Sequence, residues 1–182
     1  MIKHIDTIVI GGGQAGLSTS YFLRKNGIEH VVLEQTEMPG SAWAHGRWDS
    51  FTLVTPNWSV RLPGAPYQGA DPDGFMGKEE LIALFERYVQ MHKLPVRYTV
   101  RVESVVHDGA AKRYLIDAGP EKYQACNVVV ATGLFQRPRI SPLQSKFPDS
   151  IWQIHSSQYR NPEHLPRGGV LVIGSSQSGA QI

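Results

Sequence analysis

Two glycine-rich loops constrain this chain more than any other feature of its sequence. The first is DTIVIGGGQAG at residues 6–16, and the second is VLVIGSSQSG at residues 170–179. In each, a short apolar run leads into spaced glycines, which is the order in which a buried strand turns into the helix of a dinucleotide-binding βαβ unit. Two such loops in one polypeptide predict a flavin held in one domain and a nicotinamide brought by another.

The first loop has every part that dinucleotide binding requires. Gly11 permits a tight turn out of the strand, Gly13 lets a pyrophosphate approach the backbone, and Gly16 lets the helix pack close to the strand. The phosphates would lie at the helix N-terminus, against free N–H groups and the positive end of the dipole. Glu34 follows Gly11 by 23 residues, where a carboxylate binds ribose hydroxyls and disfavours a 2′-phosphate. These residues favour FAD or NAD over NADP at this site, and leave the choice between FAD and NAD open.

The periodicity of the chain predicts an α/β fold. A buried strand, a helix and a second strand form a βαβ unit, and a long irregular stretch rich in Pro, Gly and Trp precedes a second helix. Three strand-like segments with turn signals between them then predict an antiparallel meander. The expected strands are Thr7–Ile10, His30–Glu34, Tyr98–Val106, Arg113–Asp117, Lys122–Val130, Ile151–Ile154 and Val170–Ile173, and the expected helices are Gln14–Lys25 and Lys78–Lys93.

Composition narrows the function classes. The net charge of +2 comes from scattered Lys and Arg residues, so no nucleic-acid partner is expected. Cys126 is the single cysteine, which excludes an internal disulfide and indicates a reducing compartment. The N-terminus leads straight into the first strand without a signal peptide, and no apolar run approaches the ~20 residues of a membrane span. We therefore expect a soluble cytoplasmic protein with no membrane partner and no metal site, whose oligomeric state the sequence leaves open.

Four further segments carry a family resemblance. They are VVVATG at residues 128–133 with the later Pro138, RWDSFTLVTPNW at 47–58, DPDGFM at 71–76 and HSSQYRNP at 155–162. Together with the glycine loops they resemble the flavin-containing monooxygenase-like family of FAD- and NAD(P)-dependent oxidoreductases, and the last three resemble a bacterial branch of it. The resemblance covers essentially the whole chain in the right order. It implies a Rossmann-like FAD-binding domain whose first segment is residues 1–163, and the beginning of an NAD(P)-binding domain at residues 164–182, as the front part of a longer enzyme.

The resemblance also assigns cofactor contacts. The first glycine loop would hold the FAD pyrophosphate and Glu34 the adenosine ribose, whereas the second loop would meet NADP or NAD. Asn57 is the candidate catalytic residue, because related enzymes present a polar side chain to the flavin there, and an amide could hydrogen-bond a flavin hydroperoxide. An equally good interpretation makes Asn57 a turn residue after Pro56. The full set of expected cofactor-binding residues is Gly11, Gly13, Gln14, Ala15, Gly16, Glu34, Gln35, Gly40, Trp43, Val102, Ala131, Thr132, Gly133, Gly174, Ser176, Gln177, Ser178 and Gly179.

Two departures from the family pattern bear on the chemistry. The family fingerprint places a histidine and an aromatic residue at the spacing of His155 and Tyr159, but its glycine is replaced by Asp149 and Phe147 lies two residues too far from the histidine. This weakens the case for full monooxygenase chemistry and favours a linker role for His155. In the second loop Ser176 stands where the middle glycine would be, and its Cβ obstructs the closest backbone approach although its hydroxyl can contact a phosphate.

The resemblance implies an FAD-dependent oxidoreductase reduced by NAD(P)H, monooxygenase-like, that passes electrons to O₂ and oxidises a small organic substrate. One alternative is a pyridine-nucleotide–disulfide reductase. The lone Cys126 excludes members with a cysteine pair in the FAD domain, but not those with the pair in the nicotinamide domain. The other alternative is a truncated, non-catalytic FAD-binding fragment. We expect the 182-residue chain by itself not to sustain turnover.

Overall fold

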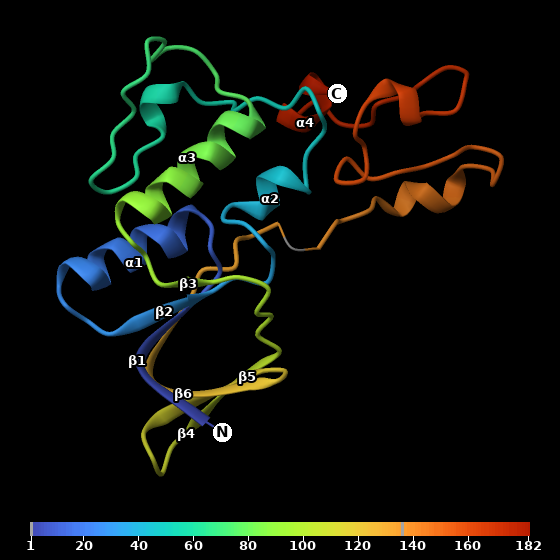
Figure 1. Cartoon of the computed structure of the whole chain (residues 1–182). Coiled ribbons are helices and arrows are strands. Elements are labelled where there is room, and N and C mark those ends of the chain that lie inside the picture. The colour runs from blue at the N-terminus through green and yellow to red at the C-terminus, as the bar shows by residue number, and fades with distance from the viewer. Residues whose placement is uncertain (1, 136) are drawn as a thin grey trace.

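A six-stranded mixed sheet organises the chain (Figure 1). The computed structural model describes residues 2–135 and 137–182. The strand order is β3-β2-β1-β6-β5-β4, in which β3, β2, β1 and β6 run parallel and β6, β5 and β4 form an antiparallel meander. This confirms the α/β class with its meander. The strands are β1 (Ile2–Ile10), β2 (His30–Leu33), β3 (Val96–Arg97), β4 (Ser104–Asp108), β5 (Arg113–Ala118) and β6 (Glu121–Val130).

Two helices, α1 (Gln14–Lys25) and α3 (Lys78–Met91), lie side by side over one face of the sheet (Figure 1). Leu17 of α1 and Phe85 and Tyr88 of α3 are almost completely buried in the core between them. These residues follow the helical repeat of apolar positions, so each helix turns one stripe inward. Burying side chains of this size stabilises the fold by about 1.5–3 kcal/mol each. The bounds predicted for the first helix are confirmed.

The parallel strands bury side chains on both faces of the sheet. Along β1, Val9 packs toward α1, whereas Ile8 and Ile10 belong to a second core cluster with Val31 and Leu33 of β2. Residues of the meander complete that cluster, including Ile116 of β5 and Tyr123 of β6. Because both faces are covered, these strands carry continuous apolar runs, as buried parallel strands do.

Two strand boundaries differ by more than two residues from the sequence prediction, and the short strand β3 was not predicted. β1 begins at Ile2 rather than Thr7, because β6 pairs with it in parallel along its whole length, from Ile2 opposite Lys122 to Ile10 opposite Val130. In the meander, residues 98–103 are not a strand and β4 begins only at Ser104. Thr99 has a left-handed φ of 57° and donates its N–H to the Thr36 carbonyl. The chain there runs beside the end of β2, so it does not enter the antiparallel ladder.

The long segment between Gln35 and Gly77 is irregular but ordered by contacts. It contains only the short helices α2 (Ser41–Ala44) and η1 (Asn57–Ser59), and an isolated bridge joins Thr52 to Gly77. Its apolar side chains fill the core cluster under α3, among them the buried Trp48 and Leu62. Packing thus replaces backbone pairing as the source of order in this segment.

The C-terminal part of the chain extends away from the sheet (orange to red in Figure 1). It contains η2 (Pro142–Lys146), η3 (Pro162–His164) and α4 (Gln177–Gln181). Two strands expected here, Ile151–Ile154 and Val170–Ile173, are not formed in the described residues. A strand satisfies its backbone groups only against a neighbour, and neither run has a ladder partner in the described part of the chain.

The C-terminal part is attached to the long irregular segment by specific contacts. Asn161 Nδ2 donates to Asp49 Oδ2 at 2.6 Å, and the Asp49 N–H donates to the Arg160 carbonyl at 2.8 Å. Gln181 Nε2 of α4 donates to the Thr52 carbonyl at 3.1 Å. These bonds place the second glycine loop beside the segment that follows the first.

Candidate nucleotide-binding site

Internal packing requires glycine at two positions of the first loop. A Cβ on Gly11 would lie 2.5 Å from the Ala131 carbonyl oxygen, and the Gly11 φ of 108° disfavours any other residue. Ala131 is held there by its own N–H, which donates to the Ile10 carbonyl at 2.8 Å. A Cβ on Gly16 would lie 1.9 Å from the Gly11 carbonyl oxygen. The loop and the first turn of α1 therefore touch backbone to backbone.

Gly13 is different, because apart from its neighbours in the chain no described residue has an atom within 4 Å of the position its Cβ would take. The fold itself does not explain a glycine there. A molecule outside the chain that approaches this backbone would explain it, and a pyrophosphate on a dinucleotide-binding loop makes that approach. The open position at Gly13 is the feature of the loop that best fits a bound nucleotide.

Glu34 is buried at the end of β2 and faces the first loop. Its Oε2 accepts the Gly12 N–H at 2.7 Å, and its Oε1 accepts the Thr36 N–H at 3.0 Å and the Thr36 hydroxyl at 2.9 Å. A carboxylate offers about four lone-pair sites, so these bonds leave room for a hydroxyl donor. Sequence reasoning missed Gly12. Its only signal was its place in the run of three glycines, and a Cβ there would lie 3.1 Å from the Glu34 side chain.

The start of α1 suits an anion. Its first turn carries Gln14, Ala15, Gly16 and Leu17, all uncharged, and Gln14 and Ala15 are exposed. The free N–H groups of a first turn and the helix dipole favour negative charge. The first turn of α3 instead carries Glu79 and Glu80, which already complement its dipole. Of these two helices, only α1 has no acidic side chain in its first turn, so the positive end of its dipole is available to an anionic ligand.

Other expected contact residues surround this loop at different depths. Gly40 is buried, its N–H donates to the Gly12 carbonyl at 3.1 Å, and a Cβ there would lie 2.3 Å from the Phe85 ring. Val102 is partly buried against the second core cluster. Trp43 is partly buried, with its ring 5.6 Å from that of Phe51 and 5.2 Å from the Arg47 guanidinium. Three further expected residues are exposed at the surface: Gln35, Thr132 and Gly133.

Asn57, the candidate catalytic residue, is 4% exposed and its amide is bonded within its own loop. Its Nδ2 donates to the Asp71 carbonyl at 2.9 Å and to the Tyr67 hydroxyl at 3.4 Å, and its Oδ1 accepts the Met76 N–H at 2.7 Å. Both ends of the amide are thus occupied. The geometry supports the interpretation of Asn57 as a loop-forming residue, and a hydrogen bond to a flavin would require these bonds to break.

The second loop repeats the local shape of the first. Gly174 has a φ of 122°, and a Cβ on Gly179 would lie 2.0 Å from the Gly174 carbonyl oxygen. Ser176 is the N-cap of α4, with a backbone close to that of Gly13 at the N-cap of α1. Gln177 and Ser178 form the exposed first turn of α4. The fold accommodates the serine, which is exposed and has nearly the backbone angles of Gly13.

His155 is engaged locally rather than at the first loop. Its Nδ1 lies 2.9 Å from the Ser157 hydroxyl and accepts the Ser157 N–H at 3.1 Å. In residues 2–135 and 137–182, no group of three or more His, Cys, Asp or Glu side chains could hold a metal ion. None of the helices in the described part of the chain is long and apolar enough to cross a membrane.

Comparisons with known proteins agree with this geometry. A family model described as pyridine nucleotide-disulphide oxidoreductase matches residues 8–182. An uncharacterised CzcO-like oxidoreductase of Geobacillus kaustophilus is 39% identical over the whole chain, which covers 51% of that protein. The indole-3-pyruvate monooxygenase YUCCA1 of rice (Oryza sativa subsp. japonica) is 30% identical over 96% of this chain and 43% of its own length.

Among solved structures, a mutant flavin monooxygenase of Stenotrophomonas maltophilia superposes with a TM-score of 0.86 at 35% identity, over 99% of this chain and 53% of that one. The resemblance to flavin-containing monooxygenase-like proteins that the sequence indicates is confirmed by these relatives. The chain spans about half the length of the curated relatives it matches.

Proposed function

The chain belongs to the pyridine nucleotide-disulphide oxidoreductase family. From this premise we propose that it is part of a monooxygenase-like flavoprotein reduced by NADPH or NADH. In that flavoprotein it would form the FAD-binding part and the beginning of the NAD(P)-binding part. The observation that carries the proposal is the open position at Gly13, at the N-terminus of an uncharged first turn. The second loop, which has the same backbone shape, supports a second nucleotide site in the same chain.

The residues of the first loop would bind and orient FAD. The Gly13 backbone and the first N–H groups of α1 would hold the pyrophosphate, and Glu34 would accept a hydrogen bond from the adenosine ribose. The exposed Thr132 and Gly133, beside the loop through Ala131, would lie along the cofactor. Bound FAD would supply hydride acceptance from the nicotinamide and electron transfer to O₂.

The second loop would bind the phosphates of the nicotinamide nucleotide. Gly174 and Gly179 give it the turn that such a loop needs, and Ser176 would place a hydroxyl near a phosphate oxygen. The division into a first segment at residues 1–163 and a second domain from residue 164 is part of this proposal. A small organic substrate is proposed by analogy with the rice relative, whose name gives indole-3-pyruvate as its substrate.

An FAD titration of the chain tests the proposal. Glu34→Gln keeps the shape of the side chain and one acceptor for Gly12, but removes the negative charge and an acceptor oxygen. We expect FAD affinity to fall about tenfold, because a hydrogen bond to a charged group contributes roughly 1.5–3 kcal/mol. Glu103→Gln, at an exposed position, is the matched control and should leave affinity unchanged. Equal affinities for all three proteins, or no FAD binding by the unaltered chain, would contradict the proposal.

A further inference from the structure

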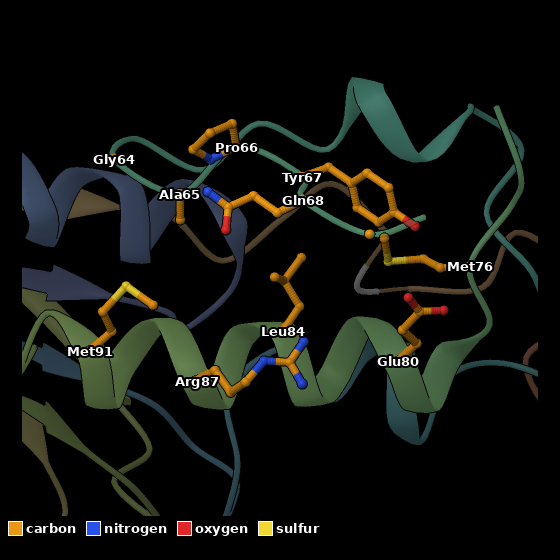
Figure 2. Close-up of a pocket in the computed structure, with 11 residues that line it drawn as sticks. Gly64, Ala65, Pro66, Tyr67, Gln68, Met76, Glu80, Leu84, Arg87 and Met91 are labelled. Atoms are coloured by element: carbon orange, nitrogen blue, oxygen red, sulfur yellow. The ribbon is translucent and has the colours of Figure 1, made fainter. Parts of the chain in front are cut away.

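A cavity of about 340 Å³ lies between α3 and residues 64–69 of the long irregular segment (Figure 2). We call it the α3 groove. It is separate from the first glycine loop, because Gly40 of that region packs against Phe85, which lies on a different stripe of α3. Its lining residues are Gly64, Ala65, Pro66, Tyr67, Gln68, Gly69, Met76, Glu80, Leu84, Arg87 and Met91.

The helix contributes a second stripe of side chains to this groove. Its inward stripe, with Leu81, Phe85 and Tyr88, is buried in the core. The groove stripe has Glu80, Leu84, Arg87 and Met91, which are four, three and four residues apart and so share one face of the helix. Figure 2 shows Leu84 pointing from the helix toward the 64–68 segment, between Glu80 and Met91. The groove thus has an apolar middle with one charged group of each sign along it.

The wall opposite the helix is held in place at its first end. The Tyr88 hydroxyl donates to the Pro63 carbonyl at 2.8 Å, and the Ala65 N–H donates to the Leu62 carbonyl at 3.0 Å. Gly64 packs so closely on Tyr21 of α1 that a Cβ there would lie 2.6 Å from the Tyr21 hydroxyl. This end of the wall is therefore built against both helices.

Asn57 fixes the other end of the groove. Its amide donates to the hydroxyl of Tyr67, a wall residue, and accepts the N–H of Met76, whose side chain is 3% exposed and lies in the groove (Figure 2). The two ends of one buried side chain therefore set the position of both Tyr67 and Met76. The groove is a consequence of fixed contacts rather than a gap beneath a loop.

The charges of the groove are available to a ligand. In the described residues the side chains of Arg87 and Glu80 have no hydrogen-bond or ion-pair partner, whereas the Lys78 ammonium in the same helix is bonded to Asp49. The guanidinium fork matches a carboxylate in shape and charge. Glu80 and Arg87 are seven residues apart, which is roughly 10 Å along the helix axis. Ligand pockets of this kind are mostly apolar with a few placed polar groups.

We propose that the α3 groove binds a small carboxylic acid with an apolar body. Its carboxylate pairs with the Arg87 guanidinium, and its apolar body lies on Leu84 and Met76. A hydrogen-bond donor at the far end of the ligand would reach Glu80. Asn57 acts as a positioning residue for this site through Tyr67 and Met76. The proposal is independent of FAD binding, so either can fail without the other.

Methionine methyl groups supply a direct test. The chain has four methionines, of which Met76 and Met91 line the groove and Met38 lies next to the first loop, where its carbonyl accepts the Thr36 hydroxyl. The chain labelled with ¹³C at its methionine methyl groups is titrated with 3-phenylpropionate. We expect the signals of Met76 and Met91 to shift together and that of Met38 to stay. 3-Phenylpropanol, which lacks the carboxylate, should bind roughly tenfold more weakly.

Two variants separate the charges. Arg87→Gln should weaken 3-phenylpropionate binding roughly tenfold, and Arg139→Gln, at an exposed position outside the groove, should not change it. Glu80→Gln should spare 3-phenylpropionate but weaken 3-(4-hydroxyphenyl)propionate, whose phenol reaches the far end, by roughly threefold. Both altered residues are exposed, so folding is preserved. No shift of Met76 and Met91, or binding that survives Arg87→Gln unchanged, would overturn the proposal.

Discussion

Residues 11–16 and residues 174–179 form loops with closely similar backbones in different surroundings. The φ angles of Gly11 and Gly174 are 108° and 122°. A Cβ on Gly16 would lie 1.9 Å from the Gly11 carbonyl oxygen, and one on Gly179 would lie 2.0 Å from the Gly174 carbonyl oxygen. Around the first loop the Ala131 carbonyl, the Gly40 N–H and the Glu34 carboxylate are all in contact. Around the second, no described atom lies within 4 Å of a Cβ on Gly174.

The strands before the two loops differ in the same way. Ile8 and Val9 of β1 are completely buried between β2 and β6, whereas residues 170–173 have exposures from 43% to 75%. The spacing of glycines is therefore enough to form the turn into a helix. The acid, the covering backbone and the buried strand come from distant parts of the chain. A glycine motif therefore predicts the backbone shape of a phosphate-binding loop. The residues that surround the loop depend on tertiary packing, which the motif does not encode.

The largest expected effect comes from placing the same side chain in both loops. Gly16→Val and Gly179→Val create the same local clash with a backbone oxygen, but only Gly16 lies in the core. We expect Gly16→Val to lower the free energy of unfolding by more than about 3 kcal/mol. Gly179→Val should cost less than about 1 kcal/mol, because α4 can open locally. Urea unfolding followed by circular dichroism measures both, and equal losses would show that the different surroundings of the two loops do not affect stability.

The next effect concerns the long irregular segment between Gln35 and Gly77. Asn57→Ala removes the acceptor of the Met76 N–H and the donor to the Asp71 carbonyl. We expect unfolding to become easier by about 2 kcal/mol, since each buried polar group left unpaired costs about 1–3 kcal/mol. Asn127 is exposed and its side chain makes only long hydrogen bonds, of 3.3 and 3.4 Å. Asn127→Ala should therefore lower the free energy of unfolding by less than about 0.5 kcal/mol. A stability unchanged by Asn57→Ala would remove its structural role and reopen a role at the flavin.

A smaller effect tests how the second loop is attached. Gln181→Ala removes the bond from α4 to the Thr52 carbonyl. We expect a loss of about 1 kcal/mol or less, together with faster hydrogen exchange of the α4 amides. Amides of α1 should keep their exchange rates, because their protection comes from the sheet and α3. Faster exchange in both helices would mean that the two loops open as one unit.

The smallest effect is the contribution of Glu121, at the start of β6, to the pH dependence of stability. The hydrogen bond from the Tyr123 hydroxyl, helped by Lys3 and Arg97, lowers the pKa of Glu121 from 4.5 to about 2. A lowered pKa in the folded state adds stability that is present above pH 4.5 and is lost as the pH falls toward 2. Glu121→Gln should therefore flatten the dependence of the melting temperature on pH in that window. Glu103→Gln is the control, and an equally flat profile for it would contradict the assignment.

The elements that sequence predicted well are those fixed by local interactions. The bounds of α1 follow from its apolar spacing and from Asn26 and Gly27 just beyond its end. The first half of β1 was missed because the polar residues Lys3, His4 and Asp6 interrupt the apolar pattern of a buried strand. This half is a strand because it pairs with β6. The start of β4 was placed too early because the sequence does not show that Thr99 and Val100 bond to residues beside β2.

In the candidate site, too, the local features could be predicted and the long-range contacts could not. The tight turn at Gly11 and the close packing of Gly16 could be predicted, because both depend on the loop itself. The approach of the Ala131 carbonyl to Gly11 could not, because it joins distant parts of the chain. The bond between Gly12 and Glu34, and the contacts that occupy Asn57, join residues from 10 to 22 positions apart. No periodic pattern encodes such contacts. The groove beside α3 was likewise not predicted, since it needs the path of residues 64–69 across the helix.

We propose that the open position at Gly13 accommodates the pyrophosphate of a bound FAD. The most direct measurement is a pair of thermal melts, with and without excess FAD, on the unaltered chain and on Gly13→Val. Without FAD the two should melt within a few degrees of each other, because apart from the chain neighbours no described residue has an atom within 4 Å of the added Cβ. At a hundredfold excess over its dissociation constant, FAD should stabilise the unaltered chain by about 2.7 kcal/mol and leave Gly13→Val unmoved. Equal upward shifts in both proteins, or none in the unaltered chain, would contradict the account.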